Sequence, residues 1–306
     1  MKKLISTKMK IFMVFLLITS ITCFTTSLVV LYRSDFKLSD YSILNNNWSF
    51  GWRDNYYNNF NTTLLDEPLT NIENLNIDFT GYKVTLEVYS GDNLIINSSD
   101  PSSSTEKSLN ISNTDGTLAI SASNISRNLL LKIPSSYTNN LDFKFTDGSA
   151  NLSDITLESL KIQSTNSDIN IDNVTLLSAN VSTTNGDINL NNINSKDLSV
   201  NTSNGEIFST NLKGNVNLSS TSGDIFASLT NEITNSKINT TNGDVELNLP
   251  IDNNFLIDFN TTNGELDDYL NSSKYNIKNH NGNFKITIGT GVVPISVTTV
   301  NGDLSF

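Results

Sequence analysis

A short signature returns along this chain, made of a hydroxyl residue, Asn-Gly, an acidic residue and an aliphatic residue. The clearest copies have their glycines at Gly186, Gly205, Gly223, Gly243, Gly264, Gly282 and Gly302. These positions are 18 to 21 residues apart. Ser167 occupies the glycine position of an earlier copy, and Gly148 and Gly116 mark looser ones. A fixed period of this length indicates one structural unit that is copied and stacked, so the repeat constrains the fold before any local propensity does.

Each copy alternates apolar and polar residues on both sides of its glycine. Counted from the glycine as zero, apolar residues fall at −7, −5, +2 and +4, with a small hydroxyl residue at −3. Around Gly186 these include Val181, Ile188 and Leu190. Alternation with period two predicts two half-buried strands per copy. Looser copies around Gly116 and Gly81 extend the pattern back to about residue 70.

Two architectures fit this alternation. In a parallel β-solenoid each copy is one coil of about 19–20 residues, and Asn-Gly forms a corner. In an antiparallel sandwich Asn-Gly is instead a type I′ hairpin turn. Similar residues recur at −3 and −1 in copy after copy, as stacking of like on like requires. This favours an all-β parallel solenoid, in which Ile188 and Ile207 are buried neighbours on parallel strands.

The N-terminal residues predict a membrane anchor. Residues 11–32 are uncharged and mostly apolar, long enough for a helix to cross a bilayer. Four lysines precede this segment, which predicts a cytoplasmic N-terminus at 1–10 and an extracellular remainder. A cleaved signal peptide is the alternative. Residues 33–70 are then a linker or N-terminal cap, and 71–306 form the repeat domain; Cys23, the chain's single cysteine, lies in the span and predicts no disulfide.

Beyond the repeats, the chain resembles a bacterial family of unknown function that is named as a putative adhesin. The resemblance rests on the N-terminal anchor, on the passages NIENLNIDFTGYKVTLEV and LLLKIPSSYTNNLDFKFTDGSANL, and on the serial TSNGEI and TTNGDV copies. It covers roughly residues 70–306. It implies a right-handed β-helix-like domain outside the cell. Ser167 in place of the turn glycine, and Asn283 in place of the acidic residue, depart from the pattern.

The acidic residue after each glycine forms a column in a stacked array. Stacked carboxylates repel one another, and a ladder of Ca²⁺ ions could bridge them. The residues of this weak calcium hypothesis are Asp187, Glu206, Asp224 and Asp244. The alternative is that they face solvent and discourage association, and the short glycine-doubled unit of calcium-binding solenoids is missing. We therefore expect no metal and no cofactor.

Catalytic signatures are weak, so we expect no enzyme. His280 is the chain's single histidine and falls in a turn. A polysaccharide-cleaving β-helix is an alternative, with Glu265, Asp267 and Asp268 as its best carboxylate cluster, but no arginine follows Arg127. Sequence patterns of nucleophile elbows, zinc proteases and phosphate loops do not occur.

The partners expected are the membrane and an envelope glycan or surface protein. The net charge is −12 and no basic stripe occurs, which argues against nucleic acid. The aromatic segment 45–63 either caps the solenoid or lies at the membrane surface. Residues 295–306, ending at Leu304 and Phe306, are expected to form an open final coil. Self-association through that coil gives a second hypothesis, an end-to-end structural assembly.

Overall fold

The computed structural model describes residues 60, 62–99, 108–123, 128–250, 254–267, 275–280 and 283–306. These residues form strands and turns only. The strands are β1 (Thr62–Pro68), β2 (Asn74–Tyr89), β3 (Asn93–Ser98), β4 (Ser108–Thr114), β5 (Thr117–Ser123), β6 (Leu129–Pro134), β7 (Asn140–Ser153), β8 (Thr156–Gln163), β9 (Asn166–Asn185) and β10 (Ile188–Asn204). They continue with β11 (Ile207–Ser222), β12 (Ile225–Asn239), β13 (Val245–Asn248), β14 (Phe255–Asn260), β15 (Leu266–Asp267), β16 (Tyr275–His280), β17 (Asn283–Ile288), β18 (Val293–Thr298) and β19 (Leu304–Ser305).

Backbone contacts divide the chain into Met1–Tyr56 and Tyr57–Phe306, and the described residues belong to the second unit. The predicted span at 11–32 and most of the aromatic segment 45–63 lie outside the described residues. Within the described part, no helix has the length and hydrophobicity needed to cross a bilayer. Strand β1 lies before residue 71 and pairs with β3, so sheet structure begins within the segment predicted as a linker or cap.

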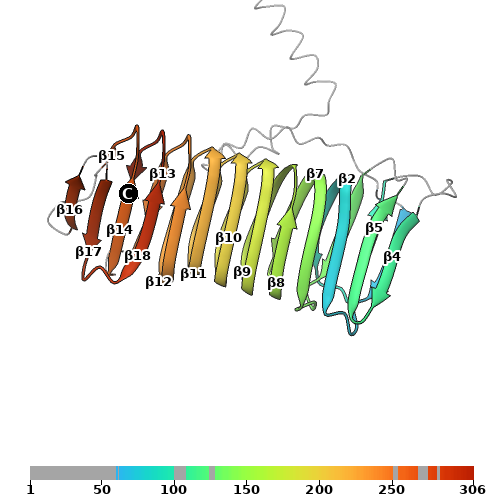
Figure 1. The fold of residues 1–306 in the computed structure, drawn as a ribbon. Coiled ribbons are helices and arrows are strands. Elements are labelled where there is room, and N and C mark those ends of the chain that lie inside the picture. The colour runs from blue at the N-terminus through green and yellow to red at the C-terminus, as the bar shows by residue number, and fades with distance from the viewer. Residues whose placement is uncertain are drawn as a thin grey trace, which may run out of the picture. The chain divides into compact units, whose positions relative to one another are not determined.

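Most long strands contribute to two rows. Strands β2 and β7 pass through Gly81 and Gly148, whereas Gly186, Gly205 and Gly223 lie between consecutive strands. Row A contains the segments before the corners, in the order β4, β5, β2, β7, β8, β9, β10, β11, β12, β18, β14, β17 and β16 (Figure 1). Row B contains the segments after the corners, in the order β1, β3, β6, β2, β7, β9, β10, β11, β12, β13, β19 and β15. Neighbours in the middle of both rows are parallel, which confirms the predicted mostly parallel all-β architecture.

The core is built from aliphatic columns that run along the stack. Ile188 pairs with Ile169 on one side and with Ile207 on the other, in parallel register, and all three are buried. Val181 and Val200 form the matching inward column of row A. Each apolar side chain is therefore covered by its counterparts in the coils above and below. The predicted inward positions of the repeat are confirmed here.

Two copies of the repeat are antiparallel hairpins and not coils. The sequence pattern predicted a coil at Gly116, but β4 and β5 pair antiparallel around Asp115–Gly116, both of which have positive φ. This is the geometry of a two-residue hairpin turn. The strands that flank the copy at Gly282, β16 and β17, are also antiparallel; Gly282 itself lies outside the described residues. The two alternative architectures thus occur together, with coils in the middle and a hairpin at each end of row A.

The last coil in the sequence is not the last coil in space, which corrects the expected open end at 295–306. Strand β18 lies between β12 and β14, and β19 lies between β13 and β15 (Figure 1). Leu304 is consequently buried by neighbours on both sides. After β13 the chain leaves the next place in the stack empty and forms the coil β14–β15 and the β16–β17 hairpin beyond it. Strands β18 and β19 then occupy the place that was left. Strand β2 is likewise internal, between β5 and β7.

Candidate functional site

The corner glycines are required by how closely the coils stack. A Cβ atom at Gly205 would lie 2.0 Å from the carbonyl oxygen of Gly186 in the preceding coil. At Gly243 the same atom would lie 2.3 Å from the Gly223 oxygen. Side chains cannot approach a backbone oxygen so closely, so these positions accept glycine alone. The predicted structural glycines of the described coils, Gly186, Gly205, Gly223, Gly243, Gly264 and Gly302, all show this contact.

The hydroxyl residue at −3 bonds the preceding corner. The Thr202 hydroxyl donates to the Gly186 carbonyl at 3.2 Å, and the Ser220 hydroxyl donates to the Gly205 carbonyl at 3.0 Å. Where Ser167 replaces glycine, the ladder with the previous coil runs unbroken through the corner. Thr183 is the −3 residue of the next copy, which follows the Ser167 corner. Its buried hydroxyl has no hydrogen-bond partner among the described residues. The replacement therefore keeps the coil and loses one buried hydrogen bond.

Aspartates of the acidic column accept hydrogen bonds from backbone N–H groups of the neighbouring coil. The backbone N–H of Glu206 donates to Asp187 Oδ1 at 2.9 Å, and the N–H of Asp244 donates to Asp224 Oδ1 at 2.8 Å. Asp244 in turn accepts from the N–H of Asp303 at 2.8 Å. Each of these aspartates has thus one oxygen engaged by the next coil. In the part of the chain that the structure describes, no group of three or more His, Cys, Asp or Glu side chains could hold a metal ion.

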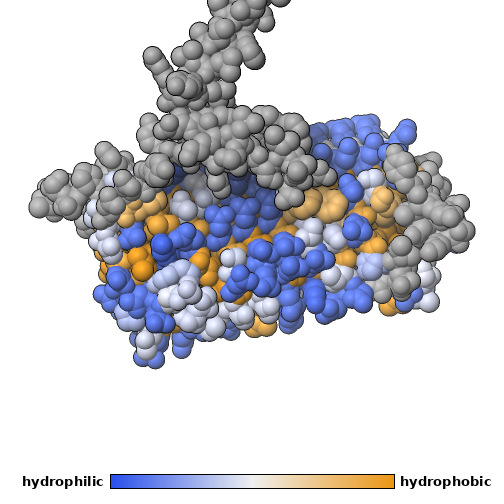
Figure 2. All heavy atoms as spheres, turned by 180° about the vertical axis from the view of Figure 1, so that it is seen from behind, coloured by the Kyte–Doolittle hydropathy of each residue, from blue (hydrophilic) through white to orange (hydrophobic). Residues whose placement is uncertain are grey.

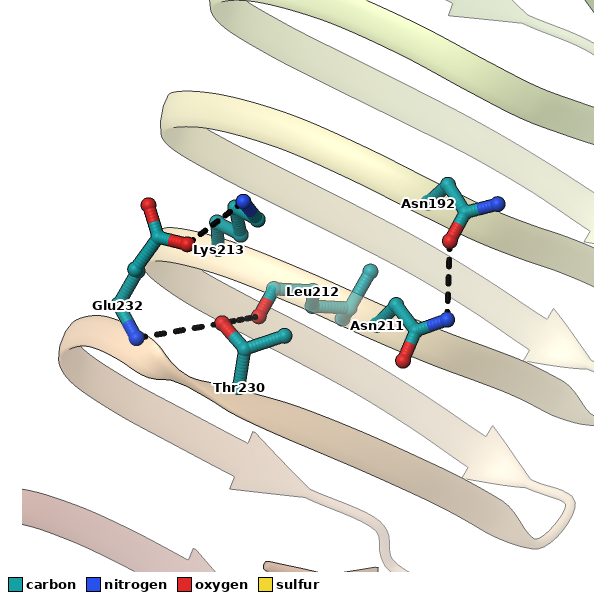
Figure 3. A network of polar contacts seen from close by, with 6 residues as sticks. All are labelled: Asn192, Asn211, Leu212, Lys213, Thr230 and Glu232. Carbon is teal, nitrogen blue, oxygen red and sulfur yellow. Dashed lines mark hydrogen bonds and ion pairs between the residues drawn. The ribbon is translucent and has the colours of Figure 1, made fainter. Parts of the chain in front are cut away.

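A second corner lies six residues after the glycine, and sequence analysis did not identify it. Asp154, Asn173, Asn192 and Asn211 all have positive φ near 50°. Asparagine and aspartate tolerate this left-handed conformation better than other non-glycine residues. Asn211 Nδ2 donates to Asn192 Oδ1 at 2.9 Å, so these side chains also form a ladder (Figure 3). The recurrence of Asn or Asp at +6 is the signal that would have predicted it.

An ion pair and a hydroxyl hydrogen bond follow directly after this second corner. Lys213 Nζ lies 2.6 Å from Glu232 Oε1, and the Thr230 hydroxyl donates to the Leu212 carbonyl at 3.0 Å (Figure 3). The Thr230 oxygen also accepts the Glu232 N–H at 3.2 Å. These contacts are exposed or partly exposed and link successive coils. They stabilise the stack and do not form a pocket.

A concave site lies on the outer surface of row A, near the end formed by the β4–β5 hairpin. It has a volume of about 410 Å³ and four strands line it. Its outward polar or small residues are Asn76 and Asp78 of β2, Asn110 and Ser112 of β4, Ala119 and Ser121 of β5, and Asp142 and Lys144 of β7. We refer to it as the row A groove. Amides, hydroxyls, carboxylates and one ammonium group therefore converge on one surface.

Charges in the row A groove are partly paired. Asp142 Oδ2 accepts from Lys161 Nζ at 2.9 Å, whereas its buried Oδ1 has no hydrogen-bond partner within the described residues. Burial raises the pKa of Asp78, but the hydrogen bonds from Thr80 and the charge of Lys144 outweigh burial and hold this pKa below its usual value. Asp78 is therefore a carboxylate acceptor near neutral pH. A buried acceptor without a donor is uncommon in proteins and favours a ligand that donates a hydrogen bond.

An aromatic pair is exposed on row B. The rings of Phe208 and Phe226 stack with centroids 4.7 Å apart, and Phe208 is 48% exposed. They continue a column of asparagines along the stack. In this column the Asn170 amide donates to Asn151 Oδ1, and the Asn189 amide donates to Asn170 Oδ1. Figure 2 shows, on the side opposite to Figure 1, hydrophobic residues lying among hydrophilic ones. The pair is a small apolar patch in a polar surface.

The weaker sequence candidates are not brought together by the described structure. His280 is the last residue of β16, and its side chain lies outside the described part. Asp267 is exposed at the end of β15, and Asp268 lies outside the described residues. Cys23 lies outside them as well. The structure thus describes only part of the proposed carboxylate cluster.

Comparison with known proteins identifies the repeat domain. The sequence model of one family, Toastrack DUF4097, matches residues 72–306. The chain belongs to this family. The resemblance based on the LLLKIP passage and the serial repeats is thereby confirmed. The function of the Toastrack domain is unknown.

No curated protein matches this Toastrack chain. Among solved structures, one similar chain is a putative cell adhesion protein from Clostridium sporogenes. It is 11% identical, the match covers 79% of this chain and 95% of that chain, and the TM-score is 0.29.

Proposed function

We propose that this Toastrack chain is a non-enzymatic binding module of the cell surface, and that the row A groove binds an envelope glycan. The observation that carries the proposal is the groove itself, with Asp142 Oδ1 in its wall, to which no described residue donates a hydrogen bond. Sugar hydroxyls donate and accept hydrogen bonds, and the groove offers amides, hydroxyls and carboxylates that complement them. Its volume is within the range of small-molecule sites.

The test compares glycan binding by two tryptophan variants of the full chain in detergent. Ser121→Trp places a large ring in the row A groove, whereas Asn180→Trp places the same ring on an exposed outward position of β9 in the same row. The probe is purified, fluorescently labelled envelope polysaccharide. We expect Ser121→Trp to lose binding and Asn180→Trp to keep it. Equal binding by both variants would remove the groove from the proposal.

The proposal includes no turnover of the glycan. The described carboxylates of the groove are an ion-paired Asp142 and an Asp78 that accepts hydrogen bonds from Thr80. The pKa of Asp78 is lowered, which is the opposite of the raised pKa of a general acid for glycoside hydrolysis. Incubation of the polysaccharide with the full chain should leave the number of reducing ends unchanged. An increase that follows the protein concentration would favour the polysaccharide-cleaving alternative.

The proposed location is the outer surface of the cell membrane, with residues 11–32 as an uncleaved span. The length of the apolar segment and the four lysines before it support this topology. We expect the full chain in the membrane fraction, with the repeats digested by protease added to intact cells. A soluble secreted form that begins near residue 30 would replace the anchor by a signal peptide.

An alternative partner is a surface protein that docks on the exposed Phe208–Phe226 pair. Aromatic side chains are frequent anchors of protein interfaces. Phe208→Ser should then reduce partner binding and leave glycan binding unchanged. The two variants distinguish the partner classes. Loss of binding in Phe208→Ser indicates a protein partner, and loss of binding in Ser121→Trp indicates a glycan.

A further inference from the structure

Strand β4 is an open edge of row A. Among the described residues it pairs with β5 alone, on one side. Ile111 is opposite Ile120, which is buried in the inward column, so Ile111 belongs to the core side of the sheet. Ile111 is nevertheless 48% exposed, since within the described part of the chain β5 is the one strand beside β4. The core column that begins inside the stack thus reaches the surface at β4.

The other edges of the two rows carry features that discourage pairing. Strand β1 contains Asp66 and Glu67 and ends at Pro68. Strand β16 contains Lys278, and β15 has two residues, one of them Asp267. Charges and proline on edge strands prevent edge-to-edge association. Strand β4, with the sequence SLNISNT, has neither a charge nor a proline. In a chain of net charge −12, it is an edge where two copies meet without placing like charges opposite each other.

The sequence of β4 is also symmetric in chemical type. Residues 108–112 read Ser-Leu-Asn-Ile-Ser, with Asn110 at the centre. In an antiparallel pairing of two such strands, Leu109 of one copy is opposite Ile111 of the other, and Asn110 is opposite Asn110. Alternate residues of a strand direct their backbone groups to the same edge, so this register is compatible with a regular ladder. Serine then meets serine, aliphatic meets aliphatic, and asparagine meets asparagine.

We propose that two copies of this chain associate through β4, antiparallel and centred on Asn110, to form a closed two-fold dimer. The added strand covers Ile111 with Leu109 of the second copy and continues the aliphatic column across the interface. The pairing is isologous, so it closes and does not produce a filament. This places association at the β4–β5 hairpin and not at the C-terminal coil. The proposal does not depend on what the row A groove binds.

Disulfide trapping tests the register. In the full chain with Cys23→Ser, Asn110→Cys places two thiols directly opposite, with Cα atoms about 4.5–5.5 Å apart, within the range of a disulfide. Ser112→Cys is the matched control, because the two cysteines are then four residues out of register and about 13 Å apart. We expect a reducible dimer from Asn110→Cys and a monomer from Ser112→Cys under mild oxidation. A dimer from neither variant, or equal dimer from both, overturns the proposed register.

Sedimentation of the full chain in detergent gives a second, independent measurement. We expect the unsubstituted chain to sediment as a dimer, Ile111→Lys to be monomeric, and Asn276→Lys on β16 to remain dimeric. Ile111 is half exposed, so lysine is tolerated there, and thermal unfolding followed by circular dichroism checks the fold. Association driven by residues 11–32 would survive Ile111→Lys. A dimer that survives this substitution, or an unsubstituted chain that stays monomeric, contradicts the proposal.

Discussion

At the scale of residues, each corner position is determined by the coil beside it. Gly205 has no side chain because the Gly186 carbonyl oxygen occupies the place of a Cβ. Thr202 is a hydroxyl residue because that same carbonyl accepts its hydrogen bond. Asp187 is acidic because its carboxylate accepts the Glu206 N–H. One short signature therefore encodes three contacts between successive coils.

The first prediction concerns the glycine column. In Gly205→Ala the new Cβ would lie 2.0 Å from the Gly186 oxygen, and the coils must move apart. We expect a loss of about 3 kcal/mol in the free energy of unfolding, at the upper end of overpacking effects. Ser167→Ala is the control, since this position of the same column already holds a Cβ; its expected loss is under about 1 kcal/mol. Urea unfolding midpoints measure both, and equal midpoints would show that the corner is not sterically closed.

At the scale of elements, the same signature marks where the chain forms a coil and where it does not. The hairpin copies have Asn113 and Asn279 at −3, and Thr117 and Asn283 at +1, so they lack both the hydroxyl and the acidic residue. Gly148 also lacks both, and there β7 continues through the corner as a strand. At Gly186, Gly205 and Gly223, where the copy has both residues, the strand is instead interrupted at the corner. Alternation alone could not distinguish coil from hairpin, because it is the same in each.

The spatial order of the coils is the feature that the sequence does not specify. Phe259, Val297 and Ile238 are paired at one inward position and all three are buried, so the alternation of apolar residues does not specify the order of their strands. The ladder of amides records the actual order, because Asn301 donates to Asn242 and Asn263 donates to Asn301. The row A groove depends on this order too. It combines β2, β7 and the β4–β5 hairpin, which are brought together only by the internal position of β2.

The second prediction follows from the internal position of β18 and β19. A chain that ends at residue 292 leaves β14 and β15 without the parallel neighbours that join them to β12 and β13. Repeat arrays are stabilised by contacts between nearest neighbours, so β14, β15 and β17 should lose their amide protection while β7–β12 keep it. Hydrogen exchange with mass spectrometry measures both regions. A chain that ends at residue 250 is the control and should protect β7–β11 equally well. Retained protection of β14, β15 and β17 would mean that these strands fold without the last coil.

At the scale of the whole molecule, part of the negative charge lies in the acidic column that runs along the stack. Aspartates 187, 224 and 244 lie in the acidic column, and each accepts a backbone N–H from the next coil. The hydrogen bond stabilises the stack, while the repulsion between neighbouring carboxylates opposes it. Monovalent salt screens exposed charges over about 8 Å at physiological ionic strength. The bonds are therefore kept at high salt while the repulsion weakens.

The third prediction separates screening from specific calcium binding. We expect the Tm of the full chain to rise steadily with NaCl, and Ca²⁺ at equal ionic strength to add no saturable increase, because one oxygen of each ladder aspartate is already engaged. In a variant with Asn in place of Asp187, Asp224 and Asp244, the amide oxygens preserve the N–H acceptors and remove three charges. This variant should show a shallower dependence of Tm on salt. A saturable rise in Tm at micromolar Ca²⁺, lost in the same variant, would instead establish the calcium ladder and identify its ligands.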